Sequence, residues 1–242
     1  MQRLTHSEAV DALRQAQKPG AGVPAYLRWV NRPLGGRAAA RGAALGITPD
    51  GMTALSAVVG LIGVLVLIGT GFFPALAPFA GPIAALAFLV SYVFDSADGQ
   101  LARILRRGGP AGEWLDHVVD GARGPLVHTA VALHLLLTGR SLWLIALAML
   151  FSVLVSAWFL SQLLADKLLP RPPRLTANAE GSNRGIAASW VHQPQDPSTT
   201  YFVIAMIGVH ALFAVLYVGL FTFLIAVCAL SLHRKRRQLR AL

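Results

Sequence analysis

Long apolar segments constrain the fold of this chain more than any other feature of its sequence. Hydrophobic residues make up 55% of the 242 residues, and a mean hydropathy of +0.58 is too high for an ordinary soluble domain. A helix needs about 20 apolar residues to cross the hydrocarbon core of a bilayer. Six stretches qualify: 48–68, 82–107, 112–137, 142–164, 186–208 and 211–232. The sequence therefore predicts an all-α, polytopic membrane protein with six transmembrane helices. The segment at 186–208 has the weakest pattern, because its first half is polar and contains Asp196.

The segment before the first span predicts two further helices. Residues 1–22 form a short polar helix, either contacting the membrane surface or a partner, or remaining a loosely ordered extension. Residues 24–45 place arginines among aromatic and aliphatic residues at helical spacing. This pattern predicts an amphipathic helix in the headgroup region, with a kink at Gly35-Gly36. We thus expect an N-terminal arm with an interfacial helix (1–46), a six-helix transmembrane domain (47–233) and a basic tail (234–242).

The basic residues predict the orientation of the chain. Of the 21 Lys and Arg residues, 19 lie in the arm, the turn at 103–111, the loop at 166–185 and the tail. By the positive-inside rule, both termini and these turns face the cytoplasm. The net charge of +10 follows the membrane edges. This distribution favours membrane lipids as partners and argues against nucleic acid.

Acidic residues gather in one place along the apolar segments. Five of the 11 acids lie between positions 95 and 120: Asp95, Asp98, Glu113, Asp116 and Asp120. A carboxylate at membrane depth costs a few kcal/mol or more, so it is a functional hypothesis by default. Asp95 and Asp98 share one face of a helix, and Asp116 and Asp120 share one face of the next. The break at Gly108-Gly109-Pro110 allows the two helices to run antiparallel, so these four carboxylates can meet.

Four carboxylates around a small volume repel one another unless cations lie between them. Ligands that are all oxygen favour Mg²⁺, Mn²⁺ or Ca²⁺. The sequence therefore predicts a metal site between the second and third spans, at the cytoplasmic end of the bundle.

The acids are part of a longer pattern, D-x2-D-G-x2-A-R-x8-G-x3-D-x3-D, which Asp95 to Asp120 match at every fixed position. The pattern resembles the signature of the CDP-alcohol phosphotransferases, integral membrane enzymes of phospholipid synthesis. The resemblance implies transfer of a substituted phosphate from a CDP-alcohol donor to the hydroxyl of an acceptor alcohol, with release of CMP. It also implies two Mg²⁺ or Mn²⁺ ions per site, six helices and a homodimer.

The same resemblance implies roles for the acids. Asp95, Asp98 and Asp116 would hold one ion, and Asp95, Asp116 and Asp120 the other. Asp120 would also be the general base that takes the proton from the acceptor hydroxyl.

Further residues are implied to bind the CDP-alcohol: Gly99, Arg103, Gly109, Gly112, Asp50 and Thr53. A side chain at Gly99 or Gly112 would keep the backbone from a diphosphate. The planar guanidinium of Arg103 can donate directed, charged hydrogen bonds to phosphate. Gly109 is equally well explained as a turn glycine. Asp50 and Thr53 come from a second resemblance, to a Thr-Pro-Asn-x-x-Thr pattern, in which Asp50 replaces the usual Asn. Thr53 has two readings, a nucleotide contact or a residue of the helix start.

The substrates stay open at this level. Relatives that use phosphorylated acceptors tend to carry basic residues at the cytoplasmic end of the fourth helix, but residues 156–162 hold no charge here. Basic residues follow only later, at Lys167, Arg171, Arg174 and Arg184. We expect CDP-diacylglycerol as donor and the inner (plasma) membrane as location. A soluble CDP-polyol donor with a polyol-phosphate acceptor is the alternative.

A different class of function is an ion- or proton-coupled transporter that uses the same carboxylates. It explains acids at membrane depth. It does not explain the glycines, the spacing of Arg103 or the gathering of the acids at one cytoplasmic end.

Overall fold

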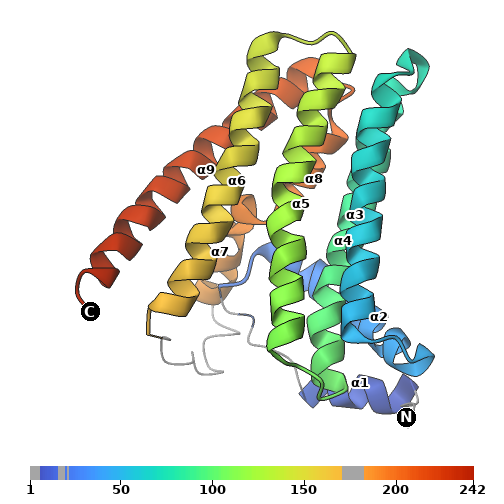
Figure 1. Ribbon diagram of the computed structural model, residues 1–242, viewed down its shortest axis with the longest axis vertical. Helices are drawn as coiled ribbons and strands as arrows, with labels where there is room; N and C mark the ends of the chain where they lie inside the picture. Colours follow the sequence, from blue (N-terminus) through green and yellow to red (C-terminus); the bar gives the residue numbers. More distant parts are fainter. Residues whose placement is uncertain (1–5, 16–19, 21, 171–182) are drawn as a thin grey trace. The chain divides into compact units, whose positions relative to one another are not determined.

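The computed structural model describes residues 6–15, 20, 22–170 and 183–242, and in these residues all regular structure is helical (Figure 1). The elements are, in chain order, α1 (His6–Gln15), the π-helix η1 (Leu27–Asn31), α2 (Arg32–Leu45), α3 (Pro49–Gly71), the 3-10 helix η2 (Pro74–Leu76), α4 (Ala77–Ile104), α5 (Pro110–Leu137), α6 (Leu142–Leu168), α7 (Asn183–Val191), the 3-10 helix η4 (Gln193–Gln195), α8 (Pro197–Ala205) and α9 (His210–Leu239). The predicted all-α fold is confirmed.

Four of these helices, α3, α4, α6 and α9, are long and apolar enough to cross a membrane. The chain is thus a polytopic membrane protein, as predicted. α5 has 28 residues and corresponds to the expected third span, with the acids of the motif in its first half. The expected span at 186–208 is wrong as a single helix. It consists of α7 and α8, nine residues each, separated by η4.

Helix bounds differ from the prediction most at the start of α4 and at the end of α9. α4 begins at Ala77, so that Pro82 lies inside the helix and does not start it. Pro82 has no backbone N–H, so one hydrogen bond within the helix is missing at this position. α9 continues through the basic residues to Leu239, so most of the predicted tail is helical.

The chain divides into two compact units. The first contains Met1–Gly63, Ala85–Asp120 and Leu175–Tyr201, and the second contains Val64–Ala84, Gly121–Arg174 and Phe202–Leu242. The whole motif, from Asp95 to Asp120, therefore belongs to the first unit.

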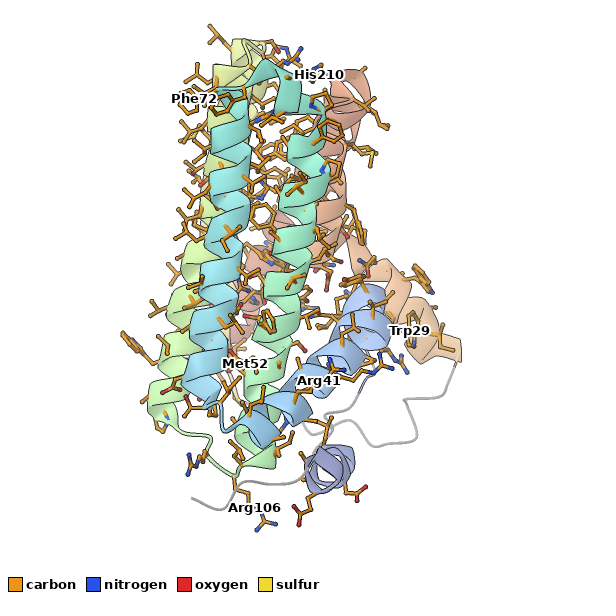
Figure 2. All side chains as sticks on the ribbon, turned by 90° about the vertical axis from the view of Figure 1, so that its right-hand side faces the viewer. Trp29, Arg41, Met52, Phe72, Arg106 and His210 are labelled. Carbon is orange, nitrogen blue, oxygen red and sulfur yellow. The ribbon has the colours of Figure 1, made fainter. Side chains whose placement is uncertain are left out.

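The N-terminal arm packs against the motif helices of the first unit. A buried cluster joins small residues of α1 and α2 to apolar residues of α3 and α4: Ala9, Ala39, Ala40, Ala43, Met52, Ala97, Leu101 and Ile104. Figure 2 shows Met52 near the start of α3, on the side of α2, with α1 next to α2. Because Ala9 is fully buried in this cluster, α1 is a packed helix and not a loosely ordered extension.

The predicted kink at Gly35-Gly36 is wrong, because α2 runs unbroken through both glycines. The pair is buried against α4 instead, and a Cβ at Gly35 would lie 2.9 Å from Gln100 Nε2 and from Ser96 Oγ. The glycines therefore allow the close approach of α2 to α4.

Side chains of the first unit form hydrogen bonds at the break between α7 and α8. Asp196 accepts the Ser198 N–H at 2.9 Å and the buried Tyr92 hydroxyl at 3.0 Å. The Thr199 hydroxyl donates to the Gln193 carbonyl at 2.7 Å. Interrupted backbone at membrane depth is tolerated only where protein groups or water satisfy it. The polar residues that weakened the sequence pattern thus serve the turn itself.

α7 is fixed to the arm by aromatic and charged residues. The rings of Trp29 and Trp190 lie 5.8 Å apart between centroids. The Arg28 guanidinium donates to the Ser189 hydroxyl at 3.2 Å and lies over the Trp29 ring. The arm and the broken segment (α7, η4 and α8, residues 183–205) therefore contact each other through Trp29 and Arg28 on one side and Trp190 and Ser189 on the other.

The second unit has an aromatic core. His128 stacks on Phe151 with 3.9 Å between ring centroids, and it is hydrogen-bonded to the Tyr217 hydroxyl at 2.6 Å. At the end of α6, Lys235 of α9 donates to Gln162 Oε1 at 2.6 Å. These contacts tie α5, α6 and α9 together within that unit.

Candidate active site

Three carboxylates of the motif converge in the first unit. α4 carries Asp95 and Asp98 one turn apart, and α5 carries Asp116. One oxygen of each lies within 4.8 Å of the others. Asp98 is buried, and the other two side chains are half-buried. Three like charges this close favour a cation between them, and oxygen-only ligands fit a hard divalent ion.

The fourth predicted acid, Asp120, lies on α5 one turn beyond Asp116 and is half-buried. It is not part of the group of three. The structure therefore separates the four acids into a close cluster and one neighbour.

Asp98 is oriented by donors on two helices. The Thr53 hydroxyl of α3 donates to Asp98 Oδ2 at 2.7 Å, and the Gly99 backbone N–H donates to Oδ1. Thr53 itself is buried, with 4% of its surface exposed. A hydrogen bond to a carboxylate is stronger than one between neutral groups, and it fixes the direction of the oxygen. In this structure Thr53 contacts an acid of the cluster directly.

The start of α3 lies beside the start of α5. The Thr48 hydroxyl accepts the Gly51 N–H at 3.0 Å, which confirms Thr48 as the N-cap. Asp50 follows in the first turn, where a negative charge suits the helix dipole. A Cβ at Gly112 would lie 3.4 Å from Asp50 Oδ1. The exposed Asp50 thus borders the motif from the α3 side.

The motif glycines leave room that the protein itself does not need. A Cβ at Gly99 would lie 3.6 Å from Arg103 Nη1, an ordinary contact, and the value for Gly112 is also ordinary. Around Gly109 nothing lies within 4 Å of such a Cβ. Packing within the described part of the protein therefore does not explain these glycines.

Arg103 borders the carboxylate cluster and is half-buried at the end of α4. Its guanidinium reaches back along the helix towards Gly99. It lies within electrostatic reach of Asp98 and also of a second arginine, Arg32 of α2. Sequence reasoning placed Arg32 only among the headgroup charges of the arm, because nothing in its local pattern links it to α4.

Of the later basic residues, Lys167 is exposed near the end of α6. Arg171 and Arg174 lie outside the described residues, and so does the side chain of Arg184. The described part of the chain therefore adds none of them to the site.

Residues 47–233 match the family model described as CDP-alcohol phosphatidyltransferase. The match includes both sequence patterns, Thr48 to Thr53 and Asp95 to Asp120. Comparison with curated proteins gave no match.

Proposed function

The chain belongs to the CDP-alcohol phosphatidyltransferase family, and from this premise we propose that it transfers a phosphatidyl group from CDP-diacylglycerol to the hydroxyl of an acceptor alcohol. The observation that carries the proposal is the cluster of Asp95, Asp98 and Asp116 within the matched region. Membership implies an enzyme that moves a phosphate group between alcohols. The donor, the ions and the individual roles are the proposal.

The cluster suits a divalent ion, and we assign the remaining acid to a second one. Asp95, Asp98 and Asp116 would hold the first ion, and Asp95, Asp116 and Asp120 the second. Bound Mg²⁺ or Mn²⁺ would neutralise the diphosphate and stabilise the leaving CMP. Thr53 supports the site by fixing the direction of Asp98.

The transfer forms a bond from the acceptor oxygen to the phosphorus that carries the lipid alcohol. It breaks the bond from that phosphorus to the bridging oxygen, whose electron pair leaves with CMP. The acceptor proton moves to the carboxylate of Asp120. Asp120 suits this role because it adjoins the cluster without belonging to the group of three.

The donor binds, in this proposal, over the turn between α4 and α5. Arg103 contacts its phosphates with a directed fork of N–H groups. Gly99, Gly109 and Gly112 allow the backbone to approach, and Asp50 borders the nucleotide from α3. An acidic Asp50 cannot donate a hydrogen bond as the usual Asn does, so it accepts from the cytidine amino group or from water.

A donor-by-acceptor matrix with detection of CMP tests the proposal. Purified protein in mild detergent receives CDP-diacylglycerol or soluble CDP-polyols, each with free and phosphorylated polyols as acceptors. We expect CMP release with CDP-diacylglycerol, dependent on Mg²⁺ or Mn²⁺ and lost in Asp116→Asn. If CMP is released from a CDP-polyol but not from CDP-diacylglycerol, the donor is a soluble CDP-polyol. If no CDP-alcohol gives CMP, the proposal is refuted.

We also propose that both termini and the site face the cytoplasm of the cell, in its inner membrane. Single cysteines placed in the connection between α3 and α4 (72–76) and in the tail, in a Cys228→Ser background, should react with a membrane-impermeant thiol reagent from opposite sides. Reaction of both from one side contradicts the orientation.

A further inference from the structure

Tyr92 is a buried residue of α4 that lies about one turn before Asp95, an acid of the carboxylate cluster. Its hydroxyl donates to Asp196 Oδ2 at 3.0 Å. Its backbone carbonyl accepts a hydrogen bond from the Asn31 side chain at 3.1 Å. Its ring is stacked on Tyr26, with 6.5 Å between the centroids. The arm and the broken segment therefore both contact α4 at a point one turn from the candidate site.

Asp196 is held in place by its own segment. It directly precedes Pro197, the first residue of α8, and so occupies the N-cap position of that helix. Its Oδ1 accepts the Ser198 N–H at 2.9 Å, the usual capping bond. Its backbone N–H donates to the Gln193 carbonyl at 3.0 Å, and the residue is 2% exposed. The carboxylate thus offers an acceptor whose position is set by the start of α8.

The cap alone does not require an acid at position 196. An asparagine caps a helix as well as an aspartate does. Asp196 uses both of its carboxylate oxygens, one for the cap and one for the Tyr92 hydroxyl. An asparagine has one side-chain oxygen and would present an N–H donor to the other partner. The second oxygen of the acid therefore serves the contact with α4.

The rotation of α4 about its axis matters for the metal site. Metal ligands have to lie within about 0.5 Å and 10–20° of the productive arrangement. Side chains one turn apart lie on the same face of a helix, so they move together when the helix rotates. A contact that fixes Tyr92 thus limits the movement of Asp95. In the proposed function Asp95 is a ligand of both ions, so its direction affects both.

We propose that Tyr92 and Asp196 are positioning residues for the metal site. Asp196, fixed at the start of α8, holds the Tyr92 hydroxyl and thereby sets the rotation of α4 that presents Asp95. This inference rests on the proposed function and adds two residues that lie outside its motif. Neither residue contacts an ion or a substrate in this proposal, because both act through the helix.

Two substitutions break the contact from opposite sides. Tyr92→Phe removes the hydroxyl and keeps the ring, and Asp196→Asn keeps an oxygen for the Ser198 cap but replaces the second oxygen by an amide nitrogen. Tyr217→Phe is the matched control, because Tyr217 is a buried tyrosine of the second unit whose hydroxyl is hydrogen-bonded to His128 at 2.6 Å.

Three quantities are measured for each variant. Mn²⁺ affinity is measured from the electron paramagnetic resonance signal of the unbound ion. The melting temperature is measured in detergent with and without Mn²⁺, and the donor KM is measured at saturating Mg²⁺. The first two quantities do not depend on turnover.

We expect Tyr92→Phe and Asp196→Asn each to weaken Mn²⁺ binding by about three- to tenfold, below the roughly 10–100-fold typical of groups bonded directly to a metal ligand. The double variant should be no weaker than the single variants, because both changes break the same hydrogen bond. The rise in melting temperature on adding Mn²⁺ should become smaller, since an ion stabilises a protein only as far as it binds. Tyr217→Phe should lower the melting temperature and leave Mn²⁺ affinity unchanged.

The inference is overturned if both variants melt at a lower temperature but bind Mn²⁺ as the wild type does, because the hydrogen bond then stabilises only the fold. It is also overturned if the donor KM rises at constant Mn²⁺ affinity, which makes Tyr92 a substrate contact. If Asp196→Asn does not fold, Tyr92→Phe decides alone. If the wild type binds Mn²⁺ but releases no CMP from any CDP-alcohol, the transfer proposal fails, while the Mn²⁺ affinities still decide the roles of Tyr92 and Asp196.

Discussion

Thr53→Val removes one hydroxyl from the candidate site and little else. Valine has nearly the shape of threonine, so the buried volume between α3 and α4 is kept. The hydrogen bond to Asp98 Oδ2, 2.7 Å in the wild type, is lost. Such a bond to a charged group contributes about 1.5–3 kcal/mol. Groups that orient a metal ligand in this way typically change metal affinity by about 10–100-fold when they are removed.

We therefore expect the Mg²⁺ concentration for half-maximal activity to rise by about 10–100-fold in Thr53→Val. The rate at saturating Mg²⁺ should recover most of its wild-type value. Thr53→Ser keeps the hydroxyl and should stay close to the wild type. Thr70→Val is the matched control, because Thr70 lies on the same helix and its hydroxyl donates to the Val66 and Leu67 carbonyls of that helix.

Two measurements check this prediction. CMP release is measured across a Mg²⁺ titration. Mn²⁺ binding is measured separately from the electron paramagnetic resonance signal of the unbound ion. If Thr53→Val binds Mn²⁺ as Thr70→Val does, the hydroxyl does not prepare Asp98 for a metal. If donor KM rises and metal affinity stays constant, Thr53 is a nucleotide contact instead.

Two further predictions concern the acids and the helix packing. Asp98→Asn should lose metal affinity and regain turnover at high Mg²⁺. Asp120→Asn should stay about 10²- to 10⁴-fold slower than the wild type at any Mg²⁺ concentration, because its amide accepts no proton. If high Mg²⁺ rescues both variants equally in a titration, Asp120 is a metal ligand only. Gly81→Ala should lower the melting temperature in detergent, because its Cβ would lie 2.5 Å from the Ile204 carbonyl oxygen and overpacking costs about 1–3 kcal/mol. Gly69→Ala, with open space around it, should not lower the melting temperature, and equal behaviour of the two variants would contradict the close approach.

The gathering of three acids followed from sequence because it depends on local rules. Asp95 and Asp98 are one turn apart on any helix, and Gly108-Gly109 lie in the break between the end of α4 at Ile104 and the start of α5 at Pro110. The same rules brought Asp116 to the cluster, since an antiparallel partner helix has few alternatives. The Thr48 cap was equally local, as its hydroxyl bonds within its own first turn.

The remaining features depend on register between helices, which no local pattern encodes. Thr53 contacts Asp98 because of the axial register between α3 and α4. Gly35 looked like a kink because a glycine pair weakens a helix, yet its missing side chain serves the approach of another helix. Arg32 and Arg37 both belong to the arginines of the arm in sequence, and the packing of α2 leaves Arg32 half-buried and Arg37 exposed.

The stretch of α4 from Tyr92 to Gln100 receives side-chain contacts from three separate segments. The arm contacts it through Asn31, α3 through Thr53, and the broken segment through Asp196, which accepts the Tyr92 hydroxyl. Each contact is local to this stretch, so together they fix the rotation of α4 about its axis. Carboxylates that repel one another tend to turn apart, and a metal site needs them held in place before the ion arrives. The polar residues of the broken segment thus have a use beyond closing their own turn, because they help to hold the helix that carries the acids.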